Sequence, residues 1–276
     1  MLEKLNNLDS RWMYLALVIV LVIPIIKPIG MSISVNKDLT QRMYDFIENL
    51  PPDSLIMFDI ASSSSSDTEI TPMIYAVMEH MAKKGHKLLV AGQWESGLAY
   101  WSPKIDERAK EYGWKYGVDY VNIGFKAGGT ATWRAIGQDF WKGAVGVDIN
   151  GTPFEELPLM ARIKKIDPET IDLIVIYESG SPGMETWITY FPTVPLVKGS
   201  VAAEISSSVR YIPTGQLKGL IPGMRGAAEY EKLVGRPGIA TQLMDAQSMS
   251  HILVILLIAL GNVAYFGAKK KSAEAR

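Results

Sequence analysis

Polar residues that could bind a ligand or do chemistry gather directly after four apolar, strand-like runs of the sequence. The groups are Asp59, Ser62 and Ser63; then Gln93, Glu95 and Ser96; then Lys126, Gly128, Gly129 and Thr130; and finally Glu178 and Ser179. In open parallel sheets, ligands bind beyond the carboxyl ends of the strands. We therefore expect these candidate ligand-binding residues to lie along one edge of a sheet.

The hydroxyls and loop amides of the first group could hold an anion, and the glycines, lysine and threonine of the third could cradle a phosphate. Each group also has an interpretation without a ligand. Ser66 and Glu69 have the spacing of a capping box, which would make the end of the serine run a helix start. The third group lacks the Gly-x-x-x-x-Gly-Lys-Thr spacing of a phosphate loop, and the fourth group is compatible with a plain turn.

The three histidines are not placed for catalysis. His80 falls inside an expected helix, His86 precedes a strand at the opposite sheet edge, and His251 lies in a C-terminal apolar segment. A Ser-His-Asp triad and a histidine metal site are therefore not expected, and no loop has calcium-hand spacing. The chain has no cysteine, which excludes disulfides and thiol chemistry. We predict no bound metal and no cofactor.

Alternating strand-like and helical segments would position these groups. Strands are expected at 54–60, 87–92, 119–125, 171–177 and 195–197, with helices at 67–84, 105–112 and 133–140. This alternation is typical of βαβ units, so we predict a three-layer α/β domain with a largely parallel sheet. The glycine-rich stretch 214–235 is expected to form a hinge or collar at the lipid surface, or an ordinary helix-turn.

The segment from Ser54 to Tyr100 resembles the opening of the ClpP/crotonase superfamily, and in particular the membrane-anchored signal peptide peptidase A family. The shared features are a strand, a small-residue loop, a helix ending at Lys84-Gly85-His86-Lys87, a second strand, and then Ser96-Gly97-Leu98-Ala99-Tyr100. The resemblance supports an α/β fold and implies Ser96 as a nucleophile, with Lys126 or Lys198 as its base. Residues 62–64, all serine, stand where that family has the Pro-Gly-Gly of its oxyanion hole.

Two apolar segments, one near each end, predict transmembrane helices. Residues 249–268 are long enough to span and are followed by three lysines. The first segment, Trp12 to Ile26, reaches a spanning length only if it extends to Met31 with Lys27 snorkelling to the headgroups. A signal peptide is the alternative, although no small-x-small cleavage triplet follows. The expected regions are an N-tail 1–11, a span 12–31, an α/β domain 32–236, a juxtamembrane segment 237–248, a span 249–268 and a basic tail 269–276.

The net charge of −1 over 276 residues hides an uneven distribution. Residues 1–29 carry +1 and residues 249–276 carry +3, which leaves −5 for the middle. Basic flanks prefer the cytoplasm, and two spans bring both ends to one side of a membrane. We therefore predict an integral membrane protein with cytoplasmic termini and an extracytoplasmic main domain. Nothing in the charge balance indicates a nucleic-acid partner.

No histidine is expected at the carboxyl end of a strand, which favours a function without catalysis. The pair Gly261–Asn262 in the second span, one small residue and one polar residue, supports the same prediction. Polar residues inside a span usually face a partner helix. We predict a membrane-anchored interaction or assembly module that works as a homo-oligomer or with other membrane subunits in the lipid bilayer. The alternatives are a membrane-anchored serine hydrolase, with Ser96 as nucleophile and Lys126 or Lys198 as base, and a sensor of phosphate- or nucleotide-type ligands.

Overall fold

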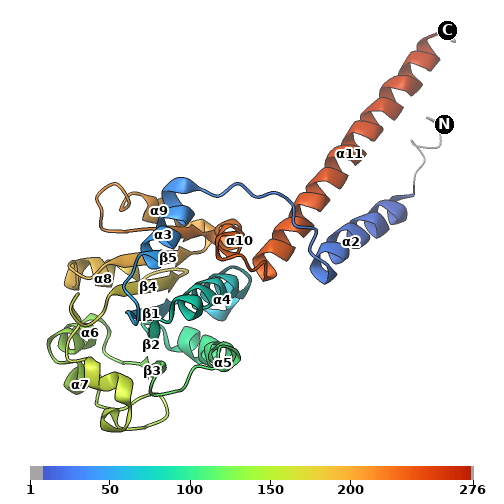
Figure 1. The fold of residues 1–276 in the computed structure, drawn as a ribbon. Coiled ribbons are helices and arrows are strands. Elements are labelled where there is room, and N and C mark those ends of the chain that lie inside the picture. The colour runs from blue at the N-terminus through green and yellow to red at the C-terminus, as the bar shows by residue number, and fades with distance from the viewer. Residues whose placement is uncertain (1–8, 275–276) are drawn as a thin grey trace. The chain divides into compact units, whose positions relative to one another are not determined.

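The computed structural model describes residues 9–274, with the backbone alone for residue 268 and residues 270–274 (Figure 1). It divides into two compact units, Met1–Ser32 with Ile239–Arg276, and Ile33–Gly238. The predicted tails, 1–11 and 269–276, fall largely outside the described residues and side chains, so they stay predictions.

The larger unit is built on a six-stranded sheet. Its strands are β1 (Leu55–Ala61), β2 (Lys87–Gly92), β3 (Tyr120–Phe125), β4 (Leu173–Glu178), β5 (Leu196–Ser200) and β6 (Leu220–Pro222). They lie in the order β3-β2-β1-β4-β5-β6, and all neighbours are parallel. This confirms the predicted α/β fold with a parallel sheet. The order reverses between β1 and β4, and the carboxyl ends of these strands form the switch point where such sheets bind ligands.

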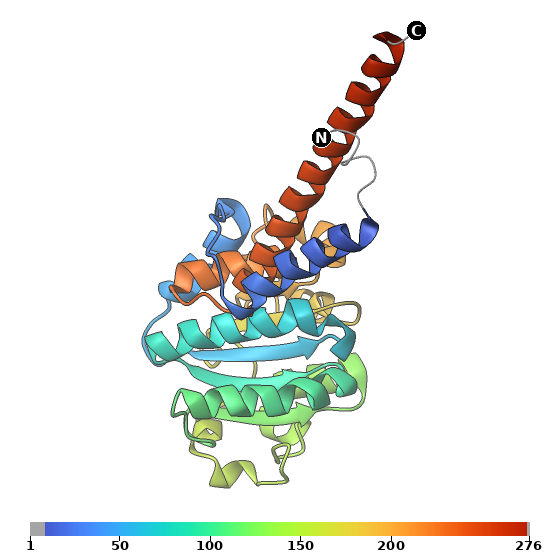
Figure 2. The same ribbon diagram turned by 90° about the vertical axis from the view of Figure 1, so that its right-hand side faces the viewer.

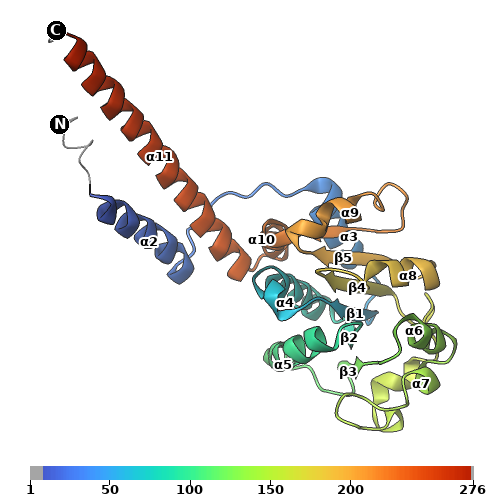
Figure 3. The same ribbon diagram turned by 180° about the vertical axis from the view of Figure 1, so that it is seen from behind.

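Helices cover both faces of this sheet. Figure 2 shows α4 (Asp67–Lys84, cyan) and α5 (Glu95–Glu111, green) lying over one face, and Figure 3 shows α6 (Gly129–Gln138) and α8 (Met184–Tyr190) on the other. The remaining helices of the unit are α3 (Arg42–Glu48), α7 (Phe140–Gly143), α9 (Ile205–Val209) and α10 (Gly223–Val234), with single turns at Lys37–Gln41, Ser64–Ser66, Phe154–Glu156, Pro158–Arg162 and Ala202–Glu204. Because both faces are covered, most strand residues are apolar, and all seven residues of β1 are buried, Asp59 included.

The ends of α4 test two expectations from the sequence. The helix closes at Gly85, which has a φ of 72° in the left-handed region, as the Lys-Lys-Gly sequence predicts. The capping-box prediction is wrong. Ser66 makes no side-chain cap bond, and Glu69 Oε2 accepts a hydrogen bond from the Ala202 amide at 2.9 Å. Glu69 is held by the chain that follows β5, a contact that spacing along one helix cannot reveal.

The smaller unit contains two apolar helices that pack against each other, α2 (Ser10–Ile26) and α11 (Ile239–Glu274). Within the described part of the chain, one helix is long and apolar enough to cross a membrane, the stretch Ile239–Gly267 of α11. The helix α2 is shorter than its predicted span, because it ends at Ile26 and Lys27 is already extended. In contrast, α11 begins ten residues before its predicted span, so most of the expected juxtamembrane segment is helical.

Asp245 ties the two ends of this smaller unit together. Its Oδ2 accepts hydrogen bonds from the amides of Ile29 and Gly30, both at 2.8 Å, and its Oδ1 accepts one from Met31 at 2.9 Å. The side chain is completely buried. Three consecutive amides thus replace the water that a buried carboxylate loses, and they fix the chain that follows α2 against the first turns of α11.

Candidate functional site

Asp59, near the end of β1, is a buried aspartate whose carboxylate accepts three hydrogen bonds. Oδ1 accepts from the Gln93 amide at 3.0 Å, and Oδ2 accepts from Gln93 Nε2 at 2.5 Å and from Trp187 Nε1 at 2.6 Å. Burial raises the pKa of Asp59 to about 6, since the loss of solvation outweighs the three bonds, and the nearby charge of Glu178 acts in the same direction.

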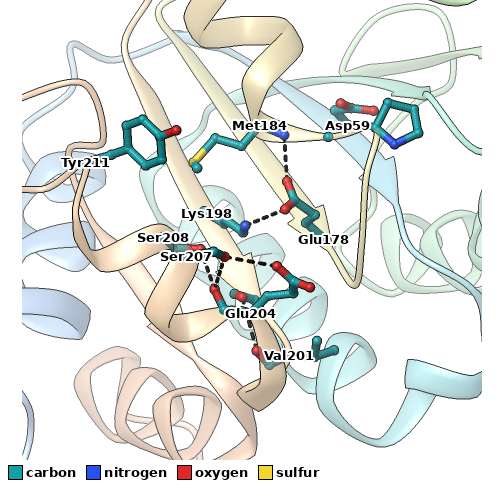
Figure 4. Close-up of polar contacts among 12 residues, drawn as sticks. Asp59, Glu178, Met184, Lys198, Val201, Glu204, Ser207, Ser208 and Tyr211 are labelled. Atoms are coloured by element: carbon teal, nitrogen blue, oxygen red, sulfur yellow. Dashed lines mark hydrogen bonds and ion pairs between the residues drawn. The ribbon is translucent and has the colours of Figure 1, made fainter.

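A second buried group, the ion pair of Glu178 and Lys198, lies on the neighbouring strands (Figure 4). Lys198 Nζ is 2.5 Å from Glu178 Oε1, and Glu178 Oε2 accepts from the Met184 amide at 2.6 Å. The two side chains are 4% and 0% exposed. Burial raises the pKa of Glu178, and the ammonium of Lys198 opposes that shift.

Strand register places both groups on one face of the sheet. Asp59 pairs with Ile176, and Ile176 pairs with Lys198. Two residues further along the same strands, Ala61 pairs with Glu178. Side chains of paired residues in parallel strands point the same way, and the direction repeats every second residue. All three charged groups therefore face the layer that contains α8, and that helix donates hydrogen bonds to both carboxylates, from Trp187 to Asp59 and from Met184 to Glu178.

Gln93 links this cluster to the segment between β4 and α8. Besides its two bonds to Asp59, its Nε2 donates to the Gly183 carbonyl at 3.1 Å and its Oε1 accepts from Thr186 Oγ1 at 2.8 Å. The next residue, Trp94, donates from Nε1 to the Pro182 carbonyl at 2.8 Å. The loop after β2 thus holds the chain that leads into α8.

The structure brings together part of the predicted site. Asp59 and Glu178 belong to the buried cluster, and Ser63 lies beside Ser179, with 3.3 Å between the Ser63 amide and the Ser179 hydroxyl. Ser62 is fully buried, and within the described residues its hydroxyl has no hydrogen-bond partner. Lys198 joins the cluster as the partner of Glu178, in a different role from the base that the resemblance implies.

Of the second group, Gln93 joins this cluster, whereas Glu95 and Ser96 do not. Glu95 and Ser96 form the first turn of α5 and are exposed. Across residues 9–274 the hydroxyl of Ser96 makes no hydrogen bond, so neither candidate lysine contacts it. Lys198 is bonded to Glu178, and Lys126 Nζ donates to the Val147 carbonyl at 3.1 Å. The nucleophile–base pair is therefore not assembled.

The third group lies apart, at the end of β3, which is separated from β1 by β2. Gly128, Gly129 and Thr130 are exposed, and the two glycines have φ values of 108° and 59°. Burial lowers the pKa of Lys126. An open depression of about 590 Å³ lies beside α6 and includes Gly128, but its lining is shallow and the other predicted residues of the group do not contribute to it.

The parts of the cluster that the sequence did not identify come from α8. Trp187 and Thr186 lie on a seven-residue helix that follows the turn-like sequence at 178–183. No repeated spacing or charge marks a helix this short. In the part of the chain that is described, no three His, Asp or Glu side chains are grouped so that they could hold a metal ion.

A second buried polar network lies away from the strand ends, between three helices. His80 of α4 shares hydrogen bonds with Tyr230 Oη through Nδ1 and with Glu48 Oε2 through Nε2, both at 2.8 Å, and its ring stacks on Tyr44 at 4.4 Å. Burial lowers the pKa of His80. The histidine therefore connects α3, α4 and α10 as a structural element.

Comparisons with known proteins give little to add to this geometry. No family model and no curated protein matches the chain. A solved structure with weak similarity is the glycotransferase of kitacinnamycin, at 16% identity and a TM-score of 0.23, covering 68% of this chain and 42% of that one. The chain thus spans less than half of the length of that protein. This TM-score is too low to indicate a shared fold.

Proposed function

We propose that this protein is a membrane-anchored α/β module that works by assembling with other membrane proteins rather than by catalysis. The observation that carries the proposal is the closed state of the charged groups at the sheet's switch point. Asp59, Glu178 and Lys198 are buried and bonded to protein atoms. A catalytic acid, base or nucleophile must reach its substrate, whereas these groups face one another and α8.

The surface of α11 supports membrane anchoring. Large apolar side chains are exposed over most of the helix surface: Ile252, Val254, Ile255, Leu256, Ile258, Leu260, Val263, Tyr265 and Phe266. Such a surface is unfavourable in water and favourable in lipid. The 29-residue candidate span of α11, which is polar in its first turns, is about 43 Å long and exceeds the roughly 30 Å hydrocarbon core of a bilayer.

The finer proposal is that α2 enters the same bilayer as the first arm of a helical hairpin. Its exposed side chains include Trp12, Val18 and Ile26. With 17 residues it is about 25 Å long, slightly short of the hydrocarbon thickness. Asp245 holds the residues that follow α2 at the start of α11, and this contact supports an uncleaved helix with both termini on the cytoplasmic side.

Assembly is supported by two neighbouring positions on α11. Asn262 is exposed on an otherwise apolar stretch, and a Cβ on Gly261 would meet nothing within 4 Å. An amide exposed to lipid is costly, and a small neighbour lets another helix approach closely. The partner that fits is an apolar helix carrying a hydrogen-bonding side chain, from a second copy or from another membrane subunit.

Blue-native electrophoresis with crosslinking in mild detergent tests this proposal. We expect the wild type to migrate in a complex and Asn262→Leu to weaken that complex. Val263→Leu is the matched control on the next exposed position, and it should leave the complex unchanged. A wild type that migrates only as a monomer, with no crosslinked partner, would contradict the assembly function.

Orientation is tested separately with cysteine chemistry, because the native chain has no cysteine background. Ser64 is exposed in the larger unit, so Ser64→Cys offers a reactive thiol there. We expect an impermeant maleimide to label this variant in intact cells, with the cysteine-free parent as the control. Labelling only after lysis would reverse the proposed topology.

A further inference from the structure

Gln93 is the only connection in the described cluster that contacts both the buried carboxylate of Asp59 and the chain entering α8. Its Nε2 donates to Asp59 Oδ2 and also to the Gly183 carbonyl, and its Oε1 accepts from Thr186. Thr186 and Gly183 are buried and Gln93 is half-buried, so these bonds lie mostly inside the protein. The orientation of the Gln93 side-chain amide therefore depends on whether Asp59 only accepts hydrogen bonds or can also donate one.

We propose that protonation of Asp59 turns over the Gln93 amide and detaches it from the Gly183 carbonyl, so that the start of α8 responds to acidification. This inference goes beyond the assembly function. It assigns an acid-responsive contact to the switch point of the sheet.

The hydrogen-bond chemistry determines the direction of this change. An ionised carboxylate only accepts, so Gln93 must present its N–H₂ group to Asp59. Protonation gives Asp59 an O–H donor at Oδ2, the oxygen that accepts from Gln93 Nε2 and Trp187 Nε1 in the ionised state. The nearest group that can accept this O–H is Gln93 Oε1, once the amide has turned over. Nε2 then faces Thr186 Oγ1, whose hydroxyl can accept as well as donate. One proton enters from solvent, and no covalent bond in the chain changes.

Burial places this response in a mildly acidic range, and the surrounding charges adjust it. Glu178 on β4 faces Asp59 and disfavours its ionised form, Lys198 on β5 is bonded to Glu178, and Glu185 on α8 acts on Glu178. The loop after β2 contributes the neutral Gln93 to the contact. Burial supports a pKa of Asp59 of about 6, so the carboxylate changes its protonation between about pH 5 and pH 7.

Two nuclear magnetic resonance signals of the full chain in detergent micelles test the proposal. The indole N–H of Trp187 donates to Asp59, and its resonance, assigned with Trp187→Phe, is expected to move upfield with a midpoint near pH 6. Labelling glycine with ¹³C and methionine with ¹⁵N selects three Gly-Met pairs, one of them Gly183-Met184. The Gly183 carbonyl is expected to move upfield at the same midpoint as it loses its Gln93 donor.

Variants separate Asp59 from other titrating groups. Asp59→Asn carries an N–H₂ group where the protonated acid carries its O–H, so its Gly183 signal should match that of the acidified wild type at pH 7.5 and should not titrate. Asp172→Asn removes a carboxylate that binds the Leu55 amide at the opposite sheet edge, and it should leave both titrations intact. Constant signals from pH 5 to pH 7.5, or a Trp187 shift without a Gly183 shift, would overturn the proposal. The wild-type result decides this even if Asp59→Asn does not fold.

Discussion

Replacing Lys198 with methionine tests whether this lysine has a structural role. Methionine keeps the length and the apolar stem of the side chain but removes the ammonium. Glu178 would then be a buried carboxylate, 4% exposed, with the Met184 amide as its remaining partner. We expect Lys198→Met to destabilise the α/β unit by about 3–5 kcal/mol, the usual cost of leaving half of a buried ion pair.

The magnitude follows from burial and distance. At the 2.5 Å separation of Lys198 Nζ and Glu178 Oε1, the Coulomb attraction is about 7 kcal/mol at an effective dielectric constant of about 20. Removing either ion from water costs several kcal/mol, so the intact pair contributes little net stability. The loss appears when one partner is removed, because the desolvation of the other is then no longer offset.

A double variant makes this test specific. Glu178→Gln with Lys198→Met removes both charges but keeps an oxygen for the Met184 amide, so it should recover most of the lost stability. Urea unfolding of the full chain in detergent, monitored by tryptophan fluorescence, measures the free energy of unfolding of both variants. In thermal unfolding, a loss of this size lowers the melting temperature by about 6–20 °C. A single variant within about 1 kcal/mol of the wild type would refute the structural role of Lys198.

Three further outcomes are expected. The folded-state pKa of Asp59 is raised from 3.8 to about 6, so protonated Asp59 stabilises the folded state at low pH, and this contribution of up to about 3 kcal/mol is lost as pH rises from about 4 to 6. Over this range the free energy of urea unfolding should fall in the wild type relative to Asp59→Asn. Parallel profiles for the two proteins would contradict this expectation. Gly97→Ala places a Cβ 1.9 Å from the Ser62 carbonyl oxygen and should cost about 3 kcal/mol or more in thermal unfolding, while the exposed neighbour change Ser96→Ala stays within about 0.5 kcal/mol. Asp245→Asn should accelerate hydrogen exchange at the Gly30 and Met31 amides by about tenfold or more, because a neutral amide oxygen is a weaker acceptor than a carboxylate. Unchanged exchange rates would mean that Asp245 does not hold this segment.

Much of the fold could be predicted from the sequence because buried parallel strands are continuous apolar runs. Residues 55–58 and 173–177 are such runs, and they form most of the central strands β1 and β4. The strand β6 could not be predicted, since it has three residues in a glycine-rich stretch and pairs with β5 only after a crossover. The bounds of α11 were missed for another reason: polar residues before 249 interrupt the apolar pattern but not the helix.

The candidate site was predicted in part. The carboxyl-end rule identified Asp59 and Glu178, because it depends only on strand direction. It could not identify Trp187 or Thr186, since these depend on how α8 folds back over the sheet. The resemblance implied Lys198 as a base for Ser96. In the structure Lys198 lies in the middle of β5, pairs with Ile176 of β4, and bonds to Glu178 two residues further along that strand.

The molar mass of the protein purified from its own membrane shows whether the chain works in an assembly. Light scattering in mild detergent, with the detergent contribution subtracted, measures the protein part of the particle. We expect a mass well above the 30.5 kDa of one chain, from further copies or from co-purified membrane subunits. A homogeneous particle of 30.5 kDa would contradict a function in assembly.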